Sequence, residues 1–264
     1  EVTLLRFDHV SLTYGAQNIL KDISFEIQEG QFAVFIGPSG CGKTTTLKMI
    51  NRLIQPDSGH IYLGGQDIAA KDRYELRRHT GYVIQQIGLF PNMTVAQNIC
   101  VVPKLLKWPK DKCDQMAREL LDMVDMPYDQ YAHKYPGEMS GGQQQRIGIL
   151  RALAASPPVV LMDEPFSALD YQSRLIVSGD IGRIIKDARI TALLITHDLS
   201  EAISLSDRII VLSKRPATIK RQIDISLSLT DDSLLAARNA PEFKDYFSLL
   251  WKEISDEYES KTCT

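Results

Sequence analysis

Long apolar runs are missing from this sequence of 264 residues. No stretch approaches the ~18 consecutive apolar residues of a membrane-spanning helix. The residues from Glu1 to Asp8 also lack the basic start and the apolar core of a secretory signal. We therefore expect a chain that neither crosses nor enters a membrane by itself.

Cysteine is scarce and scattered along the chain. The four cysteines, Cys41, Cys100, Cys113 and Cys263, form no C-x-x-C pair, so neither a zinc site nor a disulfide framework is indicated. This usage fits a reducing cytosol.

An excess of positive charge is also absent, because the net charge is -3 and the isoelectric point is about 6.0. This balance does not attract a phosphate backbone and no local basic patch stands out, so we expect no nucleic-acid partner.

What the sequence does have is 44% hydrophobic and 24% charged residues, the composition of a globular protein. A chain of this length folds as one large domain or as two lobes.

The N-terminal part of the sequence indicates an antiparallel β-region. Leu4–Phe7 and Ile23–Ile27 alternate apolar and polar residues, and Tyr14-Gly15 lies between them as a turn. The fully apolar run Phe32–Ile36 then leads into a glycine-rich loop, and the residues from Thr45 to Leu53 have helical character.

The rest of the chain alternates helical and strand patterns. Residues from about 98 to 155 read as helical, and three apolar strand runs follow, separated by helical lengths. This alternation predicts an α/β core in which helices cover a parallel sheet. After Lys214 a short strand and a helix from about Pro241 to Tyr258 are expected. The three strand runs are 158–162, 192–195 and 208–212.

A phosphate-binding loop is the strongest motif. Residues 37–45 fit G-x-x-x-x-G-K-[ST] and lie between the predicted strand and the predicted helix, as the motif requires. Its glycines let backbone N–H groups turn toward phosphate oxygens, Lys43 reaches the β- and γ-phosphates, and the Thr44 hydroxyl binds Mg²⁺. The predicted nucleotide-binding residues of this loop are Gly37, Pro38, Ser39, Gly40, Cys41, Gly42, Lys43, Thr44 and Thr45.

A second glycine motif, Met139-Ser140-Gly141-Gly142-Gln143, precedes a predicted helix. Ser140 is suited to cap that helix, which on its own is a structural role. The run also resembles the signature sequence of ABC transporter ATPases, commonly Leu-Ser-Gly-Gly-Gln, with methionine in place of leucine. In that family this helix start binds the γ-phosphate held by the opposite subunit. The resemblance therefore implies that Ser140, Gly141, Gly142 and Gln143 bind nucleotide in trans.

A pair of carboxylates follows the apolar strand run Val159–Met162. The segment resembles the Walker B strand of the same family, which implies that Asp163 is the Mg²⁺-associated carboxylate and Glu164 the base that polarises water. A carboxylate at the carboxyl end of a buried parallel strand points into the crevice where α/β sheets bind ligands. Taken alone, the pair fits a solvated turn before Pro165 equally well.

Four further residues match family motifs in family order. Gln85, after the strand at 81–84, matches the glutamine that contacts Mg²⁺ and water, and Gln86 is the adjacent alternative. His197 matches the histidine that hydrogen-bonds the γ-phosphate, although a lone histidine is more often a capping or core residue. Asp170 matches the D-loop residue that helps to join two subunits. Tyr14 matches the aromatic residue that stacks on adenine, or is only a packed turn residue.

The resemblance covers roughly residues 4–214 and implies a fold. We expect an α/β protein, a P-loop NTPase (ABC ATPase) core with an N-terminal antiparallel β-region and an inserted helical subdomain. The ABC ATPase domain would span 1–214, with a RecA-like core at about 1–86 and 156–214 and a helical subdomain at about 87–155. A C-terminal extension, a short strand plus a helix, would span 215–264.

The resemblance also implies an ATPase that uses ATP and Mg²⁺ and works as a homodimer or pseudo-dimer, with each nucleotide clamped between two subunits. The metal contacts would come from Thr44, Gln85 and Asp163. The catalytic residues would be Lys43, Gln85, Glu164 and His197, which act mainly by position and electrostatics.

A membrane partner is implied as well. ABC transporter ATPases bind the cytoplasmic face of the inner membrane peripherally, through integral permease subunits, and serve an extracytoplasmic solute-binding protein indirectly. Leu89, Phe90 and Met93 lie in a loop beside Gln85, where exposed apolar residues would be unusual on a free-standing enzyme. We interpret this loop, which starts at Ile87, as part of a socket for the permease, or alternatively as packing inside the helical lobe.

The transported solute is less well defined by the sequence. Met49–Ile54, Tyr82–Pro91 and Val102–Pro109 are most similar to importer ATPases for osmoprotectants such as glycine betaine, carnitine and choline. Many of those proteins continue into paired regulatory CBS domains, for which this chain ends too soon. Its tail, at Leu212–Ile219 and Ala240–Phe243, instead resembles importers of sulfonates, nitrate or thiamine precursors.

Two other classes stay open. ABC ATPases that serve DNA repair or chromosome structure insert long coiled coils, and those of translation carry two cassettes, whereas this chain has one cassette with a short helical insert. An exporter ATPase is disfavoured by the osmoprotectant-like middle segment.

Cys41 carries a separate hypothesis. A thiol at a helix N-terminus inside a phosphate site is expected to have a lowered pKa, so that its oxidation or alkylation would block ATP. The simpler interpretation is that several small residues fit this position.

Overall fold

The computed structural model describes residues 2–86, 88–231 and 233–259. The chain divides into two compact units. The first unit comprises Glu1–Leu76 and Thr191–Thr264, and the second comprises Arg77–Ile190. None of the helices in the described ranges combines the length and the apolar composition that crossing a lipid bilayer requires.

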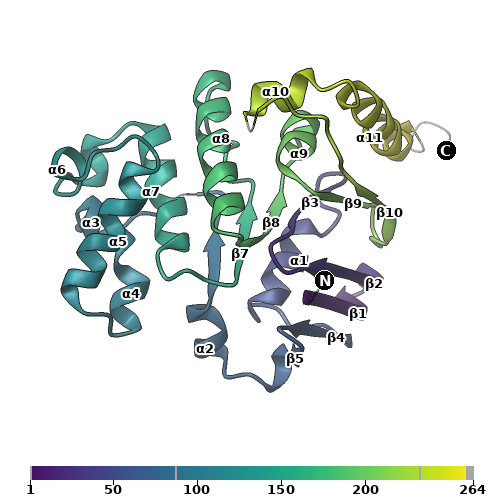
Figure 1. Ribbon diagram of the computed structural model, residues 1–264. Helices are drawn as coiled ribbons and strands as arrows, with labels where there is room; N and C mark the ends of the chain where they lie inside the picture. The colour runs from purple at the N-terminus through teal and green to yellow at the C-terminus, as the bar shows by residue number, and fades with distance from the viewer. Residues whose placement is uncertain (1, 87, 232, 260–264) are drawn as a thin grey trace. The chain divides into compact units, whose positions relative to one another are not determined.

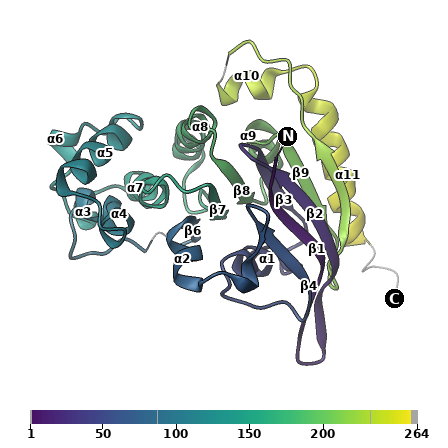
Figure 2. The ribbon, with the colours of Figure 1, turned by 60° about the horizontal axis from the view of Figure 1, so that its bottom comes forward.

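The first unit contains an antiparallel sheet built on a long N-terminal hairpin (Figure 2). Its strands pair in the order β2-β1-β4-β5 and every pairing is antiparallel, which confirms the predicted N-terminal β-region. Gly15, with a φ of 58°, forms the turn between the first two strands, a conformation that favours glycine. The strands are β1 (Thr3–Tyr14), β2 (Gln17–Gln28), β4 (Ser58–Leu63) and β5 (Gln66–Asp67).

A second group of strands in the first unit carries the phosphate loop. Strand β3 (Phe32–Ile36) lies between β8 (Thr191–Ile195) and β9 (Arg208–Leu212), and both pairings are parallel. All five residues of β3 are buried, as expected for a central strand covered on both faces. Strand β10 (Ile219–Asp224) pairs antiparallel with β9. The chain leaves β3 through the glycine-rich loop and enters α1 (Lys43–Ile50).

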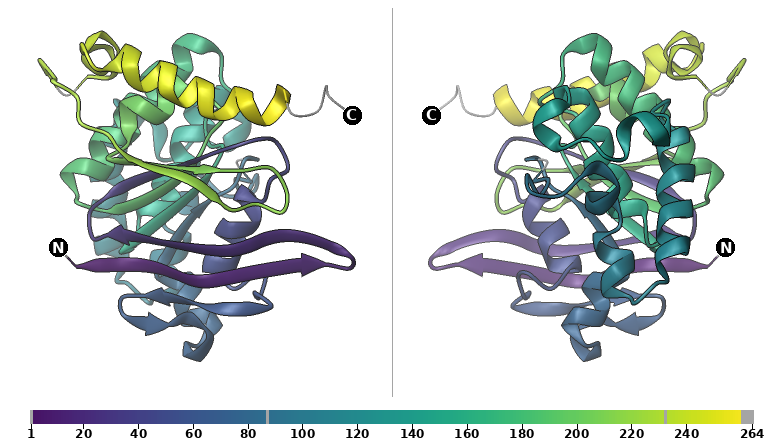
Figure 3. Two further views of the ribbon diagram at one scale, coloured as in Figure 1. Left: turned by 90° about the vertical axis from the view of Figure 1, so that its right-hand side faces the viewer. Right: turned by 90° about the vertical axis from the view of Figure 1, so that its left-hand side faces the viewer.

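The predicted C-terminal extension packs on the first unit through two helices. Helices α10 (Leu234–Asn239) and α11 (Phe243–Glu259) both contact α9 (Leu199–Leu205), and α11 runs alongside β10 (Figure 3). Glu253 fixes α11 to β10, because its carboxylate accepts a 2.8 Å hydrogen bond from Arg221 and its carbonyl oxygen accepts one of 2.7 Å from Lys220. The predicted terminal helix is confirmed, whereas α10 was not predicted.

The second unit is mainly helical around one pair of parallel strands, β6 (Thr80–Val83) and β7 (Val159–Asp163) (Figure 1). Between these strands the chain forms the helices that the sequence predicted from about residue 98 onward. Helix α2 (Arg73–Arg78) contains the boundary between the units. The other α-helices are α3 (Val95–Ile99), α4 (Val101–Leu105), α5 (Lys110–Asp122), α6 (Tyr128–Tyr131), α7 (Gly141–Leu153) and α8 (Tyr171–Asp187).

Candidate functional site

The phosphate loop lies in the first unit between β3 and α1, as predicted. Two of its glycines are sterically required. A Cβ on Gly37 would lie 2.7 Å from the carbonyl oxygen of Leu212, and a Cβ on Gly42 would lie 2.7 Å from a methyl group of Leu20. Gly42 also has a φ of 124°, which other residues rarely adopt. The loop conformation therefore depends on glycine at both positions.

Lys43 places its ammonium group inside this loop. The side chain is only 8% exposed, and Nζ donates hydrogen bonds to the carbonyl oxygens of Gly37, at 2.7 Å, and Pro38, at 2.9 Å. Helix α1 begins at Lys43, and its N-cap residue Gly42 has no side chain to accept from the first backbone N–H groups. A buried ammonium group and a helix start without a side-chain cap together favour an anion at this place.

Cys41 does not have the lowered pKa that the sequence suggested. The thiol is 2% exposed, and its Sγ lies 3.8 Å from Nζ of Lys43. Burial raises the pKa of Cys41, and this effect outweighs the opposing influence of the Lys43 charge. The prediction of a reactive thiolate is therefore wrong, because the cysteine packs inside the loop.

The two carboxylates lie in the second unit. Asp163 is the last residue of β7, and Glu164 follows it with a φ of 46°, an uncommon left-handed conformation for a residue other than glycine. Burial raises the pKa of Tyr82, on the neighbouring strand β6, to about 12, and the negative charge of Asp163 contributes to the rise. Glu164 is half-buried.

The structure brings Gln85 and Glu164 together. Gln85 lies two residues after β6, and its Nε2 donates a 3.3 Å hydrogen bond to Oε2 of Glu164. Because β6 and β7 are parallel neighbours, both side chains follow the carboxyl ends of their strands. It is Gln85, and not the adjacent Gln86, that makes this bond to Glu164.

The predicted signature segment forms the start of α7. Ser140 is the N-cap, and its Oγ accepts a 3.2 Å hydrogen bond from the backbone N–H of Gln143. The side chain of Gln143 accepts in return from the backbone N–H of Ser140 at 3.0 Å, which completes a capping box. Ser140 and Gly141 are exposed, so the cap leaves this helix start open to a partner.

Asp170 caps α8 in a similar way. Its Oδ1 accepts hydrogen bonds from the backbone N–H groups of Gln172, at 3.1 Å, and Ser173, at 3.0 Å. The hydrogen bonds from Ser173 hold the pKa of Asp170 below its usual value. The carboxylate is thus kept charged at the exposed start of this helix.

His197 and Tyr14 lie on the surface of the first unit. His197 follows β8 and is exposed, and Asp198 is the residue that caps α9. Neither the core nor the capping interpretation of this histidine therefore holds. Tyr14, at the end of β1, is 50% exposed, so packing does not account for it.

The loop after Gln85 is held by a buried asparagine that was not predicted from the sequence. Asn98 is fully buried, and its Nδ2 donates 3.1 Å hydrogen bonds to the carbonyl oxygens of Phe90, Met93 and Thr94. Its Oδ1 accepts from the backbone N–H of Phe90 at 2.8 Å. In the sequence, the only indication of this role is that the bonded carbonyl groups lie four to eight residues before Asn98. Such a spacing is common and does not by itself predict a buried asparagine.

Of the predicted socket, Phe90 is 42% exposed while Leu89 and Met93 are half-buried. Ile87 lies outside the described residues. The guanidinium of Arg151 lies 5.6 Å from the centre of the Phe90 ring and donates to the carbonyl oxygen of Gly88 at 2.9 Å. The loop is therefore ordered by Asn98 and Arg151 with part of its apolar surface outward.

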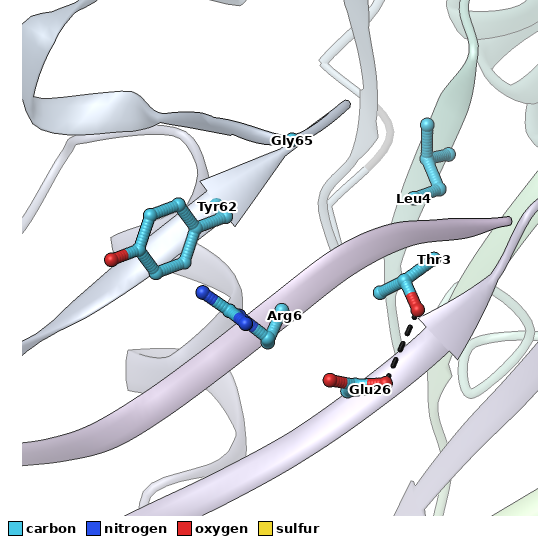
Figure 4. A pocket seen from close by; sticks show the side chains of 6 residues that line it. All are labelled: Thr3, Leu4, Arg6, Glu26, Tyr62 and Gly65. Atoms are coloured by element: carbon cyan, nitrogen blue, oxygen red, sulfur yellow. Dashed lines mark hydrogen bonds between the residues drawn. The ribbon is translucent and has the colours of Figure 1, made fainter.

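A pocket on the antiparallel sheet is separate from these motifs (Figure 4). The guanidinium of Arg6 stacks 4.3 Å above the Tyr62 ring, and Thr3 donates to Glu26 at 3.1 Å. The pocket holds none of the predicted nucleotide-binding residues. The residues that line it are Thr3, Leu4, Arg6, Glu26, Tyr62 and Gly65.

Comparison with protein families gives a match to the ABC transporter family over residues 20–167. The chain is 55% identical over 210 residues to the glycine betaine/carnitine/choline transport ATP-binding protein OpuCA of Bacillus subtilis, an alignment that covers 79% of this chain and 55% of that protein. It is 50% identical to the osmoprotectant import ATP-binding protein OsmV of Salmonella typhimurium, over 86% of this chain and 57% of the relative. The chain thus spans about half the length of these relatives.

A relative of matching length is also found. The ABC transporter ATP-binding protein YtlC of Bacillus subtilis, described as uncharacterized, is 36% identical over 96% of both chains. Among solved structures, a dimeric ATP-binding cassette, MJ0796, bound to ADP and phosphate in a post-hydrolysis state, is similar with a TM-score of 0.73 and 31% identity. The similarity covers 84% of this chain and 99% of the cassette. The fold is accordingly the predicted α/β fold of an ABC ATPase.

Proposed function

Because the chain belongs to the ABC transporter family, we propose that it is the ATP-binding and ATP-hydrolysing subunit of an importer that takes up a small solute through a separate permease. The observation that supports this function most directly is the buried ammonium of Lys43 inside the glycine loop at the start of α1. Such a site suits the β- and γ-phosphates of ATP.

The residues also suit Mg²⁺, which prefers oxygen ligands. The candidate ligands are the Thr44 hydroxyl, the Asp163 carboxylate and the side-chain oxygen of Gln85. Gln85 uses its nitrogen in the bond to Glu164, so its oxygen keeps its capacity to bind a cation. When bound, Mg²⁺ neutralises charge on the phosphates of ATP.

Glu164 is the residue that would orient the attacking water and accept its proton. Its carboxylate accepts from Gln85 at one oxygen, which orients the group without neutralising it. Lys43 stabilises negative charge on the γ-phosphoryl group, and the exposed His197 donates a hydrogen bond to it. Tyr14 stacks on the adenine.

A second ATPase subunit is part of the proposal. Ser140, Gly141, Gly142 and Gln143 form the start of α7, at which Ser140 and Gly141 are exposed. This helix start would bind the γ-phosphate held by the partner chain, and Asp170 would help to join the two chains. The dimeric, ADP-bound state of the similar cassette described above supports this arrangement. The dimer would be formed by two copies of this chain or by this chain and a close relative.

The membrane partner would be an integral permease that docks at the loop around Phe90. The exposed Phe90 ring, on a loop held by Asn98 and Arg151, supports this surface as the socket. The chain would then lie peripherally on the cytoplasmic face of the inner membrane, and an extracytoplasmic solute-binding protein would deliver the cargo to the permease.

We propose an osmoprotectant with a quaternary ammonium group as the cargo, because OpuCA is named for the transport of glycine betaine, carnitine and choline, and OsmV for the import of osmoprotectants. The alternative cargo, a sulfonate, nitrate or a thiamine precursor, rests on the tail from Leu212 onward. The alternative from a different functional class is an ABC ATPase that takes no part in transport.

The first experiment is an ATPase assay of the purified chain beside a Glu164→Gln variant. Wild type should hydrolyse ATP, and the variant should bind ATP, lose turnover by about a hundredfold or more, and stay dimeric with ATP in size-exclusion chromatography. A variant that turns over at the wild-type rate contradicts the assigned base. The cargo is tested by copurifying the permease and comparing uptake of quaternary amines with uptake of sulfonates in vesicles.

A further inference from the structure

Gln145 is a polar side chain at a position where α7 is otherwise apolar. It is 1% exposed, and the other buried residues of α7 are aliphatic side chains and a glycine. Burying an amide is costly unless its polar atoms form hydrogen bonds. A methionine or leucine would fill such a position without that cost, so packing alone does not account for an amide at this position.

The side chain makes one hydrogen bond to a distant part of the sequence. Its Nε2 donates to the carbonyl oxygen of Pro165, the residue that directly follows Glu164. Within the described part of the chain, no donor reaches its Oε1. The amide oxygen of Gln145 is therefore unsatisfied, and the hydrogen bond from its nitrogen to Pro165 is the interaction that the buried amide contributes.

The turn that receives this bond has an unusual backbone. Glu164 has a φ of 46°, and a residue other than glycine holds such a conformation only when its surroundings enforce it. Ser167 supplies part of that constraint, since its Oγ donates to the carbonyl oxygen of Glu164 at 2.9 Å and its backbone N–H donates to the same oxygen at 3.2 Å. Gln145, which lies on α7, binds the carbonyl oxygen of the next residue, Pro165.

The same helix carries the signature segment at its first turn. Ser140 and Gln143 form the capping box of α7, and Gln145 lies two residues later. Gly142, on the first turn, lies beside Leu169 and the start of α8, because a Cβ there would lie 3.9 Å from Cβ of Ser173 and 4.0 Å from a methyl group of Leu169. The start of α7 is therefore in contact with the segment that follows the Glu164 turn.

We propose that Gln145 is a positioning residue for ATP hydrolysis: its hydrogen bond to Pro165 fixes the turn that aims the Glu164 carboxylate and joins that turn to the signature helix. The proposal rests on the ATPase function proposed above. Gln145 contacts the neighbouring carbonyl and acts on the reaction through Glu164.

The test compares Gln145→Met with a matched substitution, Gln144→Met, in the full chain. Methionine keeps the length of the side chain and removes the donor in both variants. Gln144 is half-buried, and its Nε2 donates at 3.2 Å to the carbonyl oxygen of Met139, within the same helix start. Both variants therefore lose one hydrogen bond from α7, and only one of these bonds reaches the Glu164 turn.

We expect kcat to fall about tenfold to a hundredfold in Gln145→Met, with the KM for ATP and the affinity for a non-hydrolysable ATP analogue unchanged, because small displacements of a reacting group have effects of this size. Gln144→Met should keep the wild-type kcat. A Gln145→Met variant with the wild-type kcat, or with a loss shared equally by Gln144→Met, overturns the proposal.

A second variant covers the case in which Gln145→Met does not fold. In Gln145→Glu, a protonated carboxyl group donates to Pro165 and a charged one repels it, so kcat relative to wild type should be higher at about pH 6 than at about pH 8. A flat ratio between these pH values contradicts the proposed bond.

The ATPase activity of the wild-type chain distinguishes a failure of this inference from a failure of the proposed function. A wild-type chain that hydrolyses no ATP overturns the proposed function and the role of Gln145 with it. A wild-type chain that is active, and that loses activity in Glu164→Gln but not in Gln145→Met, overturns the role of Gln145 alone.

Discussion

Gln85 and Glu164 meet at the carboxyl ends of neighbouring parallel strands, where Nε2 of Gln85 donates to Oε2 of Glu164 over 3.3 Å. The two residues are 79 positions apart in the sequence. A hydrogen bond from a neutral amide orients a carboxylate while leaving it charged, which a base that activates water requires.

The first prediction concerns this bond. Gln85→Ala removes the donor, and we expect kcat for ATP hydrolysis to fall about tenfold or more, since a hydrogen bond to a charged group contributes about 1.5–3 kcal/mol. Steady-state ATPase kinetics over a range of Mg²⁺ concentrations measure the effect. The adjacent and also exposed Gln86 provides the control, and a larger loss in Gln86→Ala than in Gln85→Ala would reverse the assignment.

Lys43 is the subject of the second prediction. Lys43→Met keeps the aliphatic stem and removes the buried ammonium group, so the affinity for ATP should fall at least about tenfold because a charge-assisted contact to phosphate is lost. Fluorescence titration with a labelled nucleotide gives the dissociation constant. Lys48→Met, in the last turn of the same helix, should bind as wild type, and equal losses in both variants would count against a specific role for Lys43.

The third prediction concerns thiol chemistry in the loop. Because burial raises the pKa of Cys41, the thiolate population near neutral pH is low, and we expect slow labelling by a maleimide reagent that accelerates as the pH rises. Peptide mass spectrometry resolves Cys41 from the other cysteines, and the guanidinium-unfolded chain gives the uninhibited rate. Rapid labelling of folded Cys41 at neutral pH would restore the hypothesis of a reactive thiol.

Tyr82 leads to a prediction about alkaline stability. Its pKa is about 12 in the folded protein against 10.0 for the free side chain, so folding favours the protonated phenol. The resulting contribution to stability is fully present below about pH 10 and is lost as the pH rises from about 10 to 12. Tyr82→Phe should therefore reduce the loss of stability in this interval and leave the pH dependence below it unchanged. Urea unfolding at a series of pH values measures this, and identical alkaline slopes in the two proteins would refute it.

The local motifs of this protein were predictable because their physical causes are local. Strand β3 is five consecutive apolar residues that end at Gly37, and the phosphate loop follows directly, so both could be located from residue type and spacing. The cap made by Ser140 was predictable for the same reason. Strand β4 was not predicted, because only His60 to Leu63 show its alternation and Gly64-Gly65 follows at once.

Properties that depend on distant packing could not be obtained in this way. The pKa of Cys41 was predicted in the wrong direction, because a helix start in a phosphate site favours a thiolate, whereas burial of the thiol, which depends on packing, raises its pKa. The bond from Gln145 to Pro165 joins residues 20 positions apart and depends on how α7 packs within its unit. Spacing in the sequence carries no information on such a contact.

Asn98 supports the last prediction, which concerns the loop proposed to contact the permease. The buried amide makes four hydrogen bonds to backbone groups of Phe90, Met93 and Thr94, so Asn98→Ala leaves several buried polar groups unsatisfied. We expect the free energy of unfolding to fall by about 1–3 kcal/mol or more, and residues 88–94 to become more sensitive to protease.

Asn92→Ala, at an exposed position of the same loop, is the matched control and should change neither quantity. Chemical denaturation and limited proteolysis test the two parts separately, and a variant with wild-type stability would show that Asn98 does not hold the loop. If the loop is the permease socket, Asn98→Ala should also weaken copurification of the permease, because the exposed Phe90 ring is carried by this loop.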